Sequence, residues 1–479
     1  MLFNSLEFAL FFPLVCVLYF SLPHRARIPL LLVASCVFYM AFVPAYILIL
    51  GATIVIDFTA GIYLEKSSGR ARTALLVTSI AATCAILFFF KYFNFFADSL
   101  VGLATFAGWT PSPVTLDIIL PIGLSFHTFQ SLSYVIEVHQ GRQRAERDFA
   151  TFATYVMFFP QLVAGPIERP QNLLDQFHEQ HRFDYLRMTS GLKRMAWGFF
   201  KKLVIADRLA LYVNDVYAAP QNFTGLQLTI ATVFFAYQIY CDFSGYSDIA
   251  VGSARVLGFR LMENFDRPYA STSIGEFWRR WHISLSTWFR DYLYVPLGGN
   301  RGGAIKHARN LLITFGVSGL WHGASWTYVI WGLLNGVYLV FGRFTKDFRA
   351  RSLAAVGIGS DSRTRQVLAW ATTFALTCVA WIFFRANSLG DAWYILTHLG
   401  SGWDFQRIGT EQFLLRQMPV ALAGIAVLEL GQFLQGRVSL PRFIANFPVV
   451  PRWAVYACFV VGVLMFGIYR SEQFIYFQF

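Results

Sequence analysis

The chain has 479 residues, of which 56% are hydrophobic, 18% are aromatic and only 14% are charged. A soluble protein carries about a quarter charged residues, so this composition excludes an ordinary soluble domain and indicates an all-α, polytopic membrane protein. The net charge of +12 comes from short basic clusters between apolar runs. That pattern indicates cytoplasmic loops and contact with membrane lipid, and it does not indicate a nucleic-acid partner. Six scattered cysteines without a CxxC pair predict neither a disulfide framework nor a metal site.

A series of apolar runs predicts about ten to twelve membrane passages. The first run carries Glu7 and precedes the basic residues Arg25 and Arg27, so we expect it to be retained, with the N-terminus outside. No connection is long or polar enough for a soluble domain, and residues 1–479 are predicted to form a single membrane domain. The runs lie at 3–22, 28–50, 51–64, 74–93, 115–136, 149–166, 190–216, 226–252, 310–342, 366–386, 416–435 and 453–469.

Proline and glycine interrupt two of these runs, at 121–125 and 160–166. Broken helices are tolerated at membrane depth where the freed backbone is buried in protein or lines a cavity. His127 and Glu168 follow the two breaks closely, which favours a cavity, but ordinary kinks would give the same pattern.

The run at 226–252 contains only two charges, Asp242 and Asp248. They lie six positions apart, so they do not share one helix face, and Gly245 is a candidate break between them. Aspartate in a membrane span pairs with another group or faces water. A polar tunnel lining and an interhelical hydrogen bond are both compatible with this pattern.

The segment 254–309 is the richest in basic residues and is predicted to lie at the cytoplasmic face. Its arginines either orient the chain and bind lipid headgroups or together bind the phosphates of a nucleotide-like donor. Within it, 277–294 mixes arginines with an apolar stripe at helical spacing, which predicts an interfacial helix. His282 lies on that stripe, as a buried structural histidine or as a functional one.

No charged residue lies between Arg309 and Arg343, and His322 is near the centre of that run. A histidine there is costly and normally faces protein or water, so 309–343 is predicted not to be a simple span. Motifs of soluble enzymes such as GxSxG, the Walker A loop, HExxH and GxGxxG are absent. A neutral buried imidazole can still act as a general base, taking the proton of a hydroxyl that attacks an acyl carbon.

Six stretches make the chain resemble the membrane-bound O-acyltransferase (MBOAT) family, and within it the bacterial alginate O-acetyltransferase-like membrane subunits. The resemblance covers nearly the whole chain, and it implies about 10–12 membrane helices around a central funnel or tunnel. The stretches are PIGLSFHTFQSLSY (121–134), PQLVAGPIERP (160–170), CDFSGYSDIA (241–250), MENFDRPY (262–269), EFWRRWHISLSTWFRDYLYVPLGGNRGG (276–303) and GLWHGASWTYVIWG (319–332).

The resemblance also implies an activity. His322 matches the family's catalytic histidine, and His282 matches a second histidine of the bacterial branch. The implied donor is cytoplasmic acetyl-CoA, without a metal, and its phosphates are expected near Arg279, Arg280 and Arg301. The implied acceptors are hydroxyls of an envelope or extracellular polysaccharide such as alginate. A periplasmic acetyltransferase or esterase-like partner is implied as well, and so is location in the bacterial inner membrane.

The C-terminal tail at 471–479, which contains FIYFQF, resembles a terminal motif of this branch that is proposed to carry the acyl group on tyrosine. Tyr476 is the matching residue, and three arginines before the last span place the tail outside the cell. An aromatic interfacial anchor is the alternative for this tail. One departure from the branch is Asn335, where a histidine is expected in close alginate relatives.

Two functions of other classes fit parts of the pattern. A carrier or flippase for an envelope lipid or polymer also uses broken helices and polar groups at membrane depth. Such a carrier would show paired inverted halves, and the hydropathy shows no such symmetry. A scaffold that recruits a soluble acetyltransferase is the other alternative.

Overall fold

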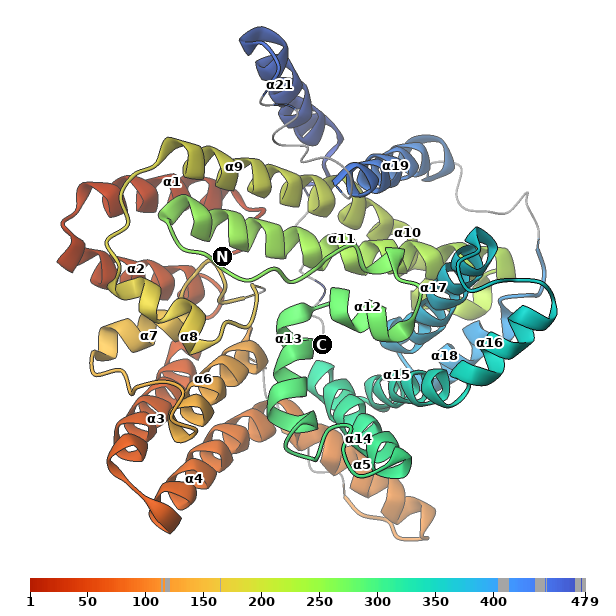
Figure 1. The fold of residues 1–479 in the computed structure, drawn as a ribbon, viewed down its shortest axis with the longest axis horizontal. Helices are drawn as coiled ribbons and strands as arrows, with labels where there is room; N and C mark the ends of the chain where they lie inside the picture. The colour runs from red at the N-terminus through yellow and green to blue at the C-terminus, as the bar shows by residue number, and fades with distance from the viewer. Residues whose placement is uncertain are drawn as a thin grey trace. The chain divides into compact units, whose positions relative to one another are not determined.

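The computed structural model describes residues 1–112, 115–116, 121–163, 165–403, 413–435, 444, 446–469 and 475. Within these ranges the chain forms helices and no strand, which confirms the predicted all-α class (Figure 1). The α-helices are α1 Leu6–Ser21, α2 His24–Met40, α3 Tyr46–Lys66, α4 Gly69–Leu87, α5 Phe93–Phe106, α6 Leu124–His139, α7 Phe149–Met157, α8 Pro170–Leu173, α9 Tyr185–Phe199, α10 Asp207–Ala218, α11 Gly225–Leu257, α12 Ile274–Arg280, α13 Ile283–Phe289, α14 Ala304–His322, α15 Trp326–Phe344, α16 Lys346–Ala355, α17 Arg363–Arg385, α18 Leu389–His398, α19 Met418–Gln435 and α21 Val449–Phe466.

Short helical segments of other geometry connect or extend several of these helices. The π-helical segments are η1 Phe88–Tyr92, η3 Phe200–Ala206, η6 Arg290–Tyr294 and η7 Phe413–Gln417. The 3₁₀ segments are η2 Asp175–His178, η4 Pro220–Asn222 and η5 Pro268–Ala270.

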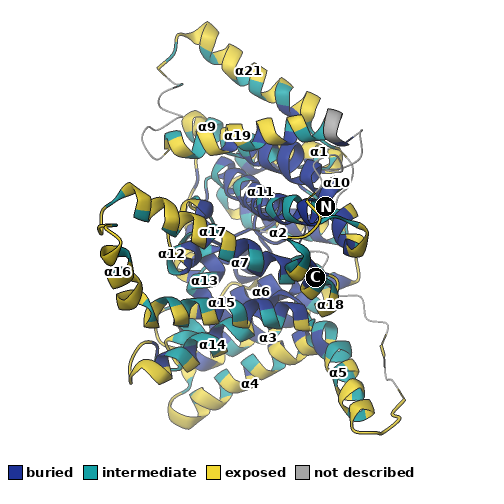
Figure 2. Cartoon of the chain, turned by 90° about the vertical axis from the view of Figure 1, so that its right-hand side faces the viewer, coloured by how far each residue is buried: buried dark blue, intermediate teal, exposed yellow. Residues whose placement is uncertain are grey.

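Among the described residues, five helical stretches are long and apolar enough to cross a membrane. Much of α4, α5 and α21 is exposed (Figure 2). Their exposed residues include Val77, Leu100 and Leu464, as expected for helices that face lipid. These observations confirm a polytopic membrane protein. The five stretches are Tyr46–Lys66, Gly69–Phe106, Arg363–Arg385, Met418–Gln435 and Val449–Phe466.

The chain divides into two compact units. The first contains Met1–Met195 and Ser247–Glu263, and the second contains Ala196–Tyr246 and Asn264–Gln478. In the first unit, Asp57 of α3 is fully buried and accepts hydrogen bonds from the hydroxyls of Ser79, Thr83 and Ser131 on α4 and α6. Such polar contacts fix helices together where lipid cannot supply a partner.

In the second unit, α14 and α15 form a closely packed helical hairpin. A Cβ at Gly332 would overlap the carbonyl oxygen of Phe315, and one at Gly319 would overlap that of Tyr328. Small residues let two helix backbones approach in this way. Trp331 of α15 then stacks on Trp381 of α17, with ring centroids 5.9 Å apart.

Three expectations about individual elements have an outcome here. The run 309–343 is split between α14 and α15, which confirms that it is not a simple span. The prediction that 277–294 forms one helix is wrong, because α12 ends at Arg280 and α13 begins at Ile283. The break expected at Gly245 is also wrong, since α11 continues through it. That glycine instead allows close contact with the Gly198 carbonyl.

Candidate active site

His322 is the last residue of α14. The helix ends where the backbone of Gly323 becomes extended, and the absence of a Cβ there lets the Tyr328 ring pack against it. The Ser325 hydroxyl then caps α15 by accepting from the Thr327 amide. The side chain of His322 is buried, at 3% exposure. A helix C-terminus carries partial negative charge, so a proton taken up by this imidazole is stabilised.

His282 lies between α12 and α13 in the left-handed region, at φ 43° and ψ 56°. This conformation is strained for a residue with a Cβ and persists only where the surroundings impose it. Asn264 supplies the constraint. Its carbonyl accepts from the Ile283 amide at 2.9 Å, and its side-chain Oδ1 accepts from the Ser284 hydroxyl at 2.9 Å. On the other side of His282, the Asp266 amide donates to the Arg280 carbonyl at 2.9 Å, so backbone hydrogen bonds to the 264–266 segment flank the histidine.

The structure brings the two predicted histidines together. Their ring centroids are 6.5 Å apart with an interplanar angle of 59°, and His282 is fully buried. His282 lies outside the five candidate spans, and burial lowers its pKa to about 3, so it is neutral at pH 7. His282 therefore supplies a neutral imidazole next to His322, and a neutral imidazole can accept a proton from a reacting hydroxyl.

Aromatic rings surround both imidazoles. Trp331, Trp321 and Phe384 meet the His322 ring edge-to-face, with centroid distances of 4.9, 5.0 and 5.4 Å. Phe243 of α11 meets His282 in the same manner at 4.6 Å. These rings exclude water, and the faces of aromatic rings favour a nearby positive charge.

Asn335, the departure noted in the sequence, supports one of these rings. Its Oδ1 accepts from the Trp278 indole at 3.3 Å, and its Nδ2 donates to the carbonyl of Trp331 at 2.8 Å. Asn335 therefore links α12 to α15 behind the tryptophan that contacts His322.

The three predicted phosphate-binding arginines lie on two elements. Arg279 and Arg280 end α12, whereas Arg301 lies in the exposed turn before α14. Arg279 and Arg301 have exposed side chains. Arg280 is half-buried and forms an ion pair with Glu276 at 2.8 Å, so it would exchange that carboxylate for a phosphate.

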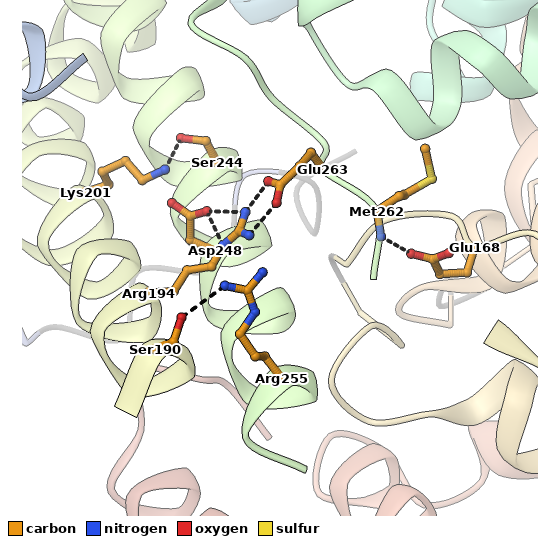
Figure 3. A network of polar contacts seen from close by, with 9 residues as sticks. All are labelled: Glu168, Ser190, Arg194, Lys201, Ser244, Asp248, Arg255, Met262 and Glu263. Atoms are coloured by element: carbon orange, nitrogen blue, oxygen red, sulfur yellow. Dashed lines mark hydrogen bonds and ion pairs between the residues drawn. The ribbon is translucent and has the colours of Figure 1, made fainter. Parts of the chain in front are cut away.

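The two aspartates of α11 have cationic partners, which favours the interhelical interpretation over a tunnel lining. Arg194 of α9 donates to Asp248 at 3.0 Å and also pairs with Glu263 (Figure 3). Asp242 pairs with Lys202 of η3 at 2.6 Å. The side chain of Lys202 is buried, so this lysine is not one of the basic residues that mark a loop.

The two predicted breaks are satisfied by side chains in the first unit. After α7 ends, the amides of Gln130 and Gln161 both donate to the freed carbonyl of Tyr155, at 2.6 and 2.8 Å. Glu168 is buried and accepts from the Met262 amide at 2.6 Å (Figure 3). At the first break, the Tyr39 hydroxyl donates to the carbonyl of Ile122 at 3.0 Å, so the backbone has protein partners at both breaks.

Two residues of the site were missed from the sequence. Asn264 lies in the MENFDRPY stretch, which marked it only as part of a motif. Lys202 lies beside Lys201 in the run at 190–216, and charged residues inside such a run are a signal that they have partners. Tyr476 lies outside the described residues. Its neighbour Ile475 is described and is buried. Among the described residues, no group of three or more His, Cys, Asp or Glu could hold a metal ion.

Comparison with known proteins places this geometry in a family. Residues 142–389 match the family model of MBOAT, the membrane-bound O-acyltransferase family. The chain is 40% identical to the probable alginate O-acetylase AlgI of Azotobacter vinelandii, over 93% of this chain and 88% of that protein. It is 32% identical to the peptidoglycan O-acetyltransferase of Helicobacter pylori, over 83% of this chain and 79% of that protein. The teichoic acid D-alanyltransferase of Streptococcus thermophilus is 26% identical, over 57% and 70%. The chain therefore belongs to the membrane-bound O-acyltransferase family and is a multi-pass membrane O-acyltransferase.

Proposed function

We propose that the protein moves acetyl from acetyl-CoA to hydroxyls of an envelope or extracellular polysaccharide, and that it works in the bacterial inner membrane. The observation that carries this proposal is the buried pair of His282 and His322, each next to a helix end. Relatives named for O-acetylation of alginate and of peptidoglycan support the acetyl group and the glycan acceptor. We also propose that residues 1–479 form one membrane domain.

The chemical step is assigned to His322 as general base. Its neutral imidazole takes the proton of a hydroxyl while the hydroxyl oxygen bonds to the thioester carbonyl carbon. The carbon–sulfur bond then breaks, and the imidazolium returns the proton to the departing thiolate, so CoA leaves as a thiol. The C-terminus of α14 and the surrounding rings stabilise the transient imidazolium. His282 is assigned to hydrogen-bond and orient the hydroxyl.

The donor is assigned to the cytoplasmic side of the 254–309 segment. The phosphates of CoA would bind Arg279, Arg280 and Arg301, and the exposure of Arg279 and Arg301 supports this assignment. At the histidine pair, the hydroxyl of Tyr476 would take the acetyl group directly from acetyl-CoA, and the acetyl group would then pass to a periplasmic acetyltransferase or esterase-like partner.

The test uses purified protein and acetyl-CoA labelled on the acetyl group, with CoA release and covalent label as readouts. His322→Ala is expected to lower the rate of CoA release by about 10²–10⁴, the usual contribution of general-base catalysis. His398→Ala is the matched control, because His398 lies on α18 and stacks on Tyr394 instead of on the site. A wild-type protein that binds acetyl-CoA without releasing CoA would contradict the proposal and favour a carrier or flippase.

A further inference from the structure

The carboxylate of Asp242 divides its two oxygens between a cation and the C-terminal segment. Oδ1 pairs with Lys202 at 2.6 Å, and Oδ2 accepts from the backbone amide of Ile475 at 2.8 Å. Asp242 and Ile475 are both 3% exposed. Ile475, which lies 233 positions from Asp242 in the chain, thus supplies a hydrogen bond to this buried carboxylate.

Residues close to Lys202 in the chain also contact the residues that precede the C-terminal tail. The Ile468 amide donates to the carbonyl of Leu203 at 3.0 Å, and the Arg208 guanidinium donates to the carbonyl of Phe466. Lys202 itself is fixed by a second carboxylate, that of Asp207, at 2.7 Å. Residues 202–208, together with Asp242, therefore contact the terminal segment at its beginning and again at Ile475.

We propose that Asp242, held in place by Lys202, is a docking site for the C-terminal tail and positions Tyr476 for acetyl transfer. The proposal rests on the proposed function for the role of Tyr476, which directly follows the anchored residue. Consecutive Cα atoms are about 3.8 Å apart, so an anchored Ile475 would limit how far the Cα of Tyr476 can move from this site. On α11, the next residue after Asp242 is Phe243, whose ring contacts His282. Asp242 is therefore the direct sequence neighbour of Phe243, a side chain of the candidate active site.

The docking interaction has a specific chemical requirement. Lys202 and the Ile475 amide are both donors, so Asp242 must present two acceptor oxygens at once. In Asp242→Asn one of the two oxygens becomes an NH₂ group, which cannot accept from either. Lys202, which carries the charge, is expected to keep the remaining oxygen, and the tail is expected to lose its acceptor.

The experiment is hydrogen–deuterium exchange of the detergent-solubilised full-length protein, followed at the Ile475 amide without acetyl-CoA. Asp242→Asn is expected to speed this exchange about ten- to a hundredfold, the effect of losing one hydrogen bond to a charged acceptor. Asp248→Asn is the matched control on the same helix. It loses a carboxylate oxygen that pairs with Arg194, and exchange at Ile475 is expected to stay at the wild-type rate. Equal exchange at Ile475 in wild type and Asp242→Asn would overturn the proposal.

A second pair of variants leaves the buried charges untouched. Ile475→Pro removes the amide hydrogen, whereas Ile475→Val keeps it along with a β-branched side chain. The other amides of the tail are expected to exchange faster in the proline variant and as in wild type in the valine variant. Identical exchange in the two would also overturn docking. Since this readout needs no catalysis, a protected tail without acetyl on Tyr476 would refute the relay and leave the docking site standing.

Discussion

At the scale of single residues, the site depends on Asn264, which fixes the backbone next to His282. It holds the first residues of α13, and through them the left-handed backbone of His282. A functional role for His322 could be predicted, because a polar side chain in an apolar membrane run is costly and is seldom present without a function. The backbone of His282 could not, because it is imposed by a residue 18 positions earlier that no local pattern links to it.

Asn264→Ala removes the acceptor for Ser284 and leaves the backbone bond to Ile283 in place. We expect acetyl transfer to fall by up to about a hundredfold, because a small displacement of a positioned group has effects of that size. Rates and the Tm of the purified variant would be measured together. Ser284→Ala removes one partner only and is expected to cost less. A variant with lowered Tm and a full rate would show that Asn264 only stabilises the fold.

At the scale of elements, the hairpin of α14 and α15 carries His322 at its bend and Trp331 in its second helix. Apolar length and a central histidine predicted a broken run. They could not give the crossing of the two helices, which depends on Gly319 and Gly332 meeting across the hairpin. The apolar stripe at 277–294 led to the wrong prediction of one continuous helix. Its helical spacing is genuine on both sides of His282, but the chain turns between the two halves.

Gly332→Ala tests that crossing. The added methyl would overlap the Phe315 carbonyl, so the helices must separate, at a cost of about 1–3 kcal/mol, and Trp331 would shift against His322. We expect a lower Tm and a slower transfer rate. The matched control is Gly342→Ala on the same helix, where a Cβ meets nothing within 4 Å. There, alanine is expected to leave Tm unchanged or raise it, because alanine favours helix more than glycine does. Equal Tm values for the two variants would contradict the close-packing argument.

At the scale of the whole molecule, composition was sufficient to predict a polytopic helical membrane protein, and the described helices agree. The number of passages was harder to predict. Several apolar runs fold as short or split helices, such as α7, whose broken end is stabilised by Gln130 and Gln161 rather than by lipid. Polar partners from distant segments decide these breaks, and apolar length alone does not reveal them.

The route of acetyl from one face of the membrane to the other is tested by Tyr476→Phe. Phenylalanine keeps the ring but has no hydroxyl to form an ester, so covalent label on the protein and acetylation of the polymer in cells are expected to be lost. Tyr469→Phe serves as the control, because that hydroxyl donates to the carbonyl of Val463 and its ring is exposed. Normal polymer acetylation by Tyr476→Phe would rule out the tail as carrier.

Lys202 also has a consequence for how the chain is made. A lysine is costly in a bilayer until a carboxylate joins it. Asp207 follows five residues later and can neutralise Lys202 as soon as both have been synthesised. Asp242 emerges 35 residues after Asp207 and can join only when α11 is inserted. The ion cluster thus sets an order of assembly during biogenesis. We expect the pair of Lys202 and Asp207 to form first, within η3 and α10, and Asp242 of α11 to join it afterwards.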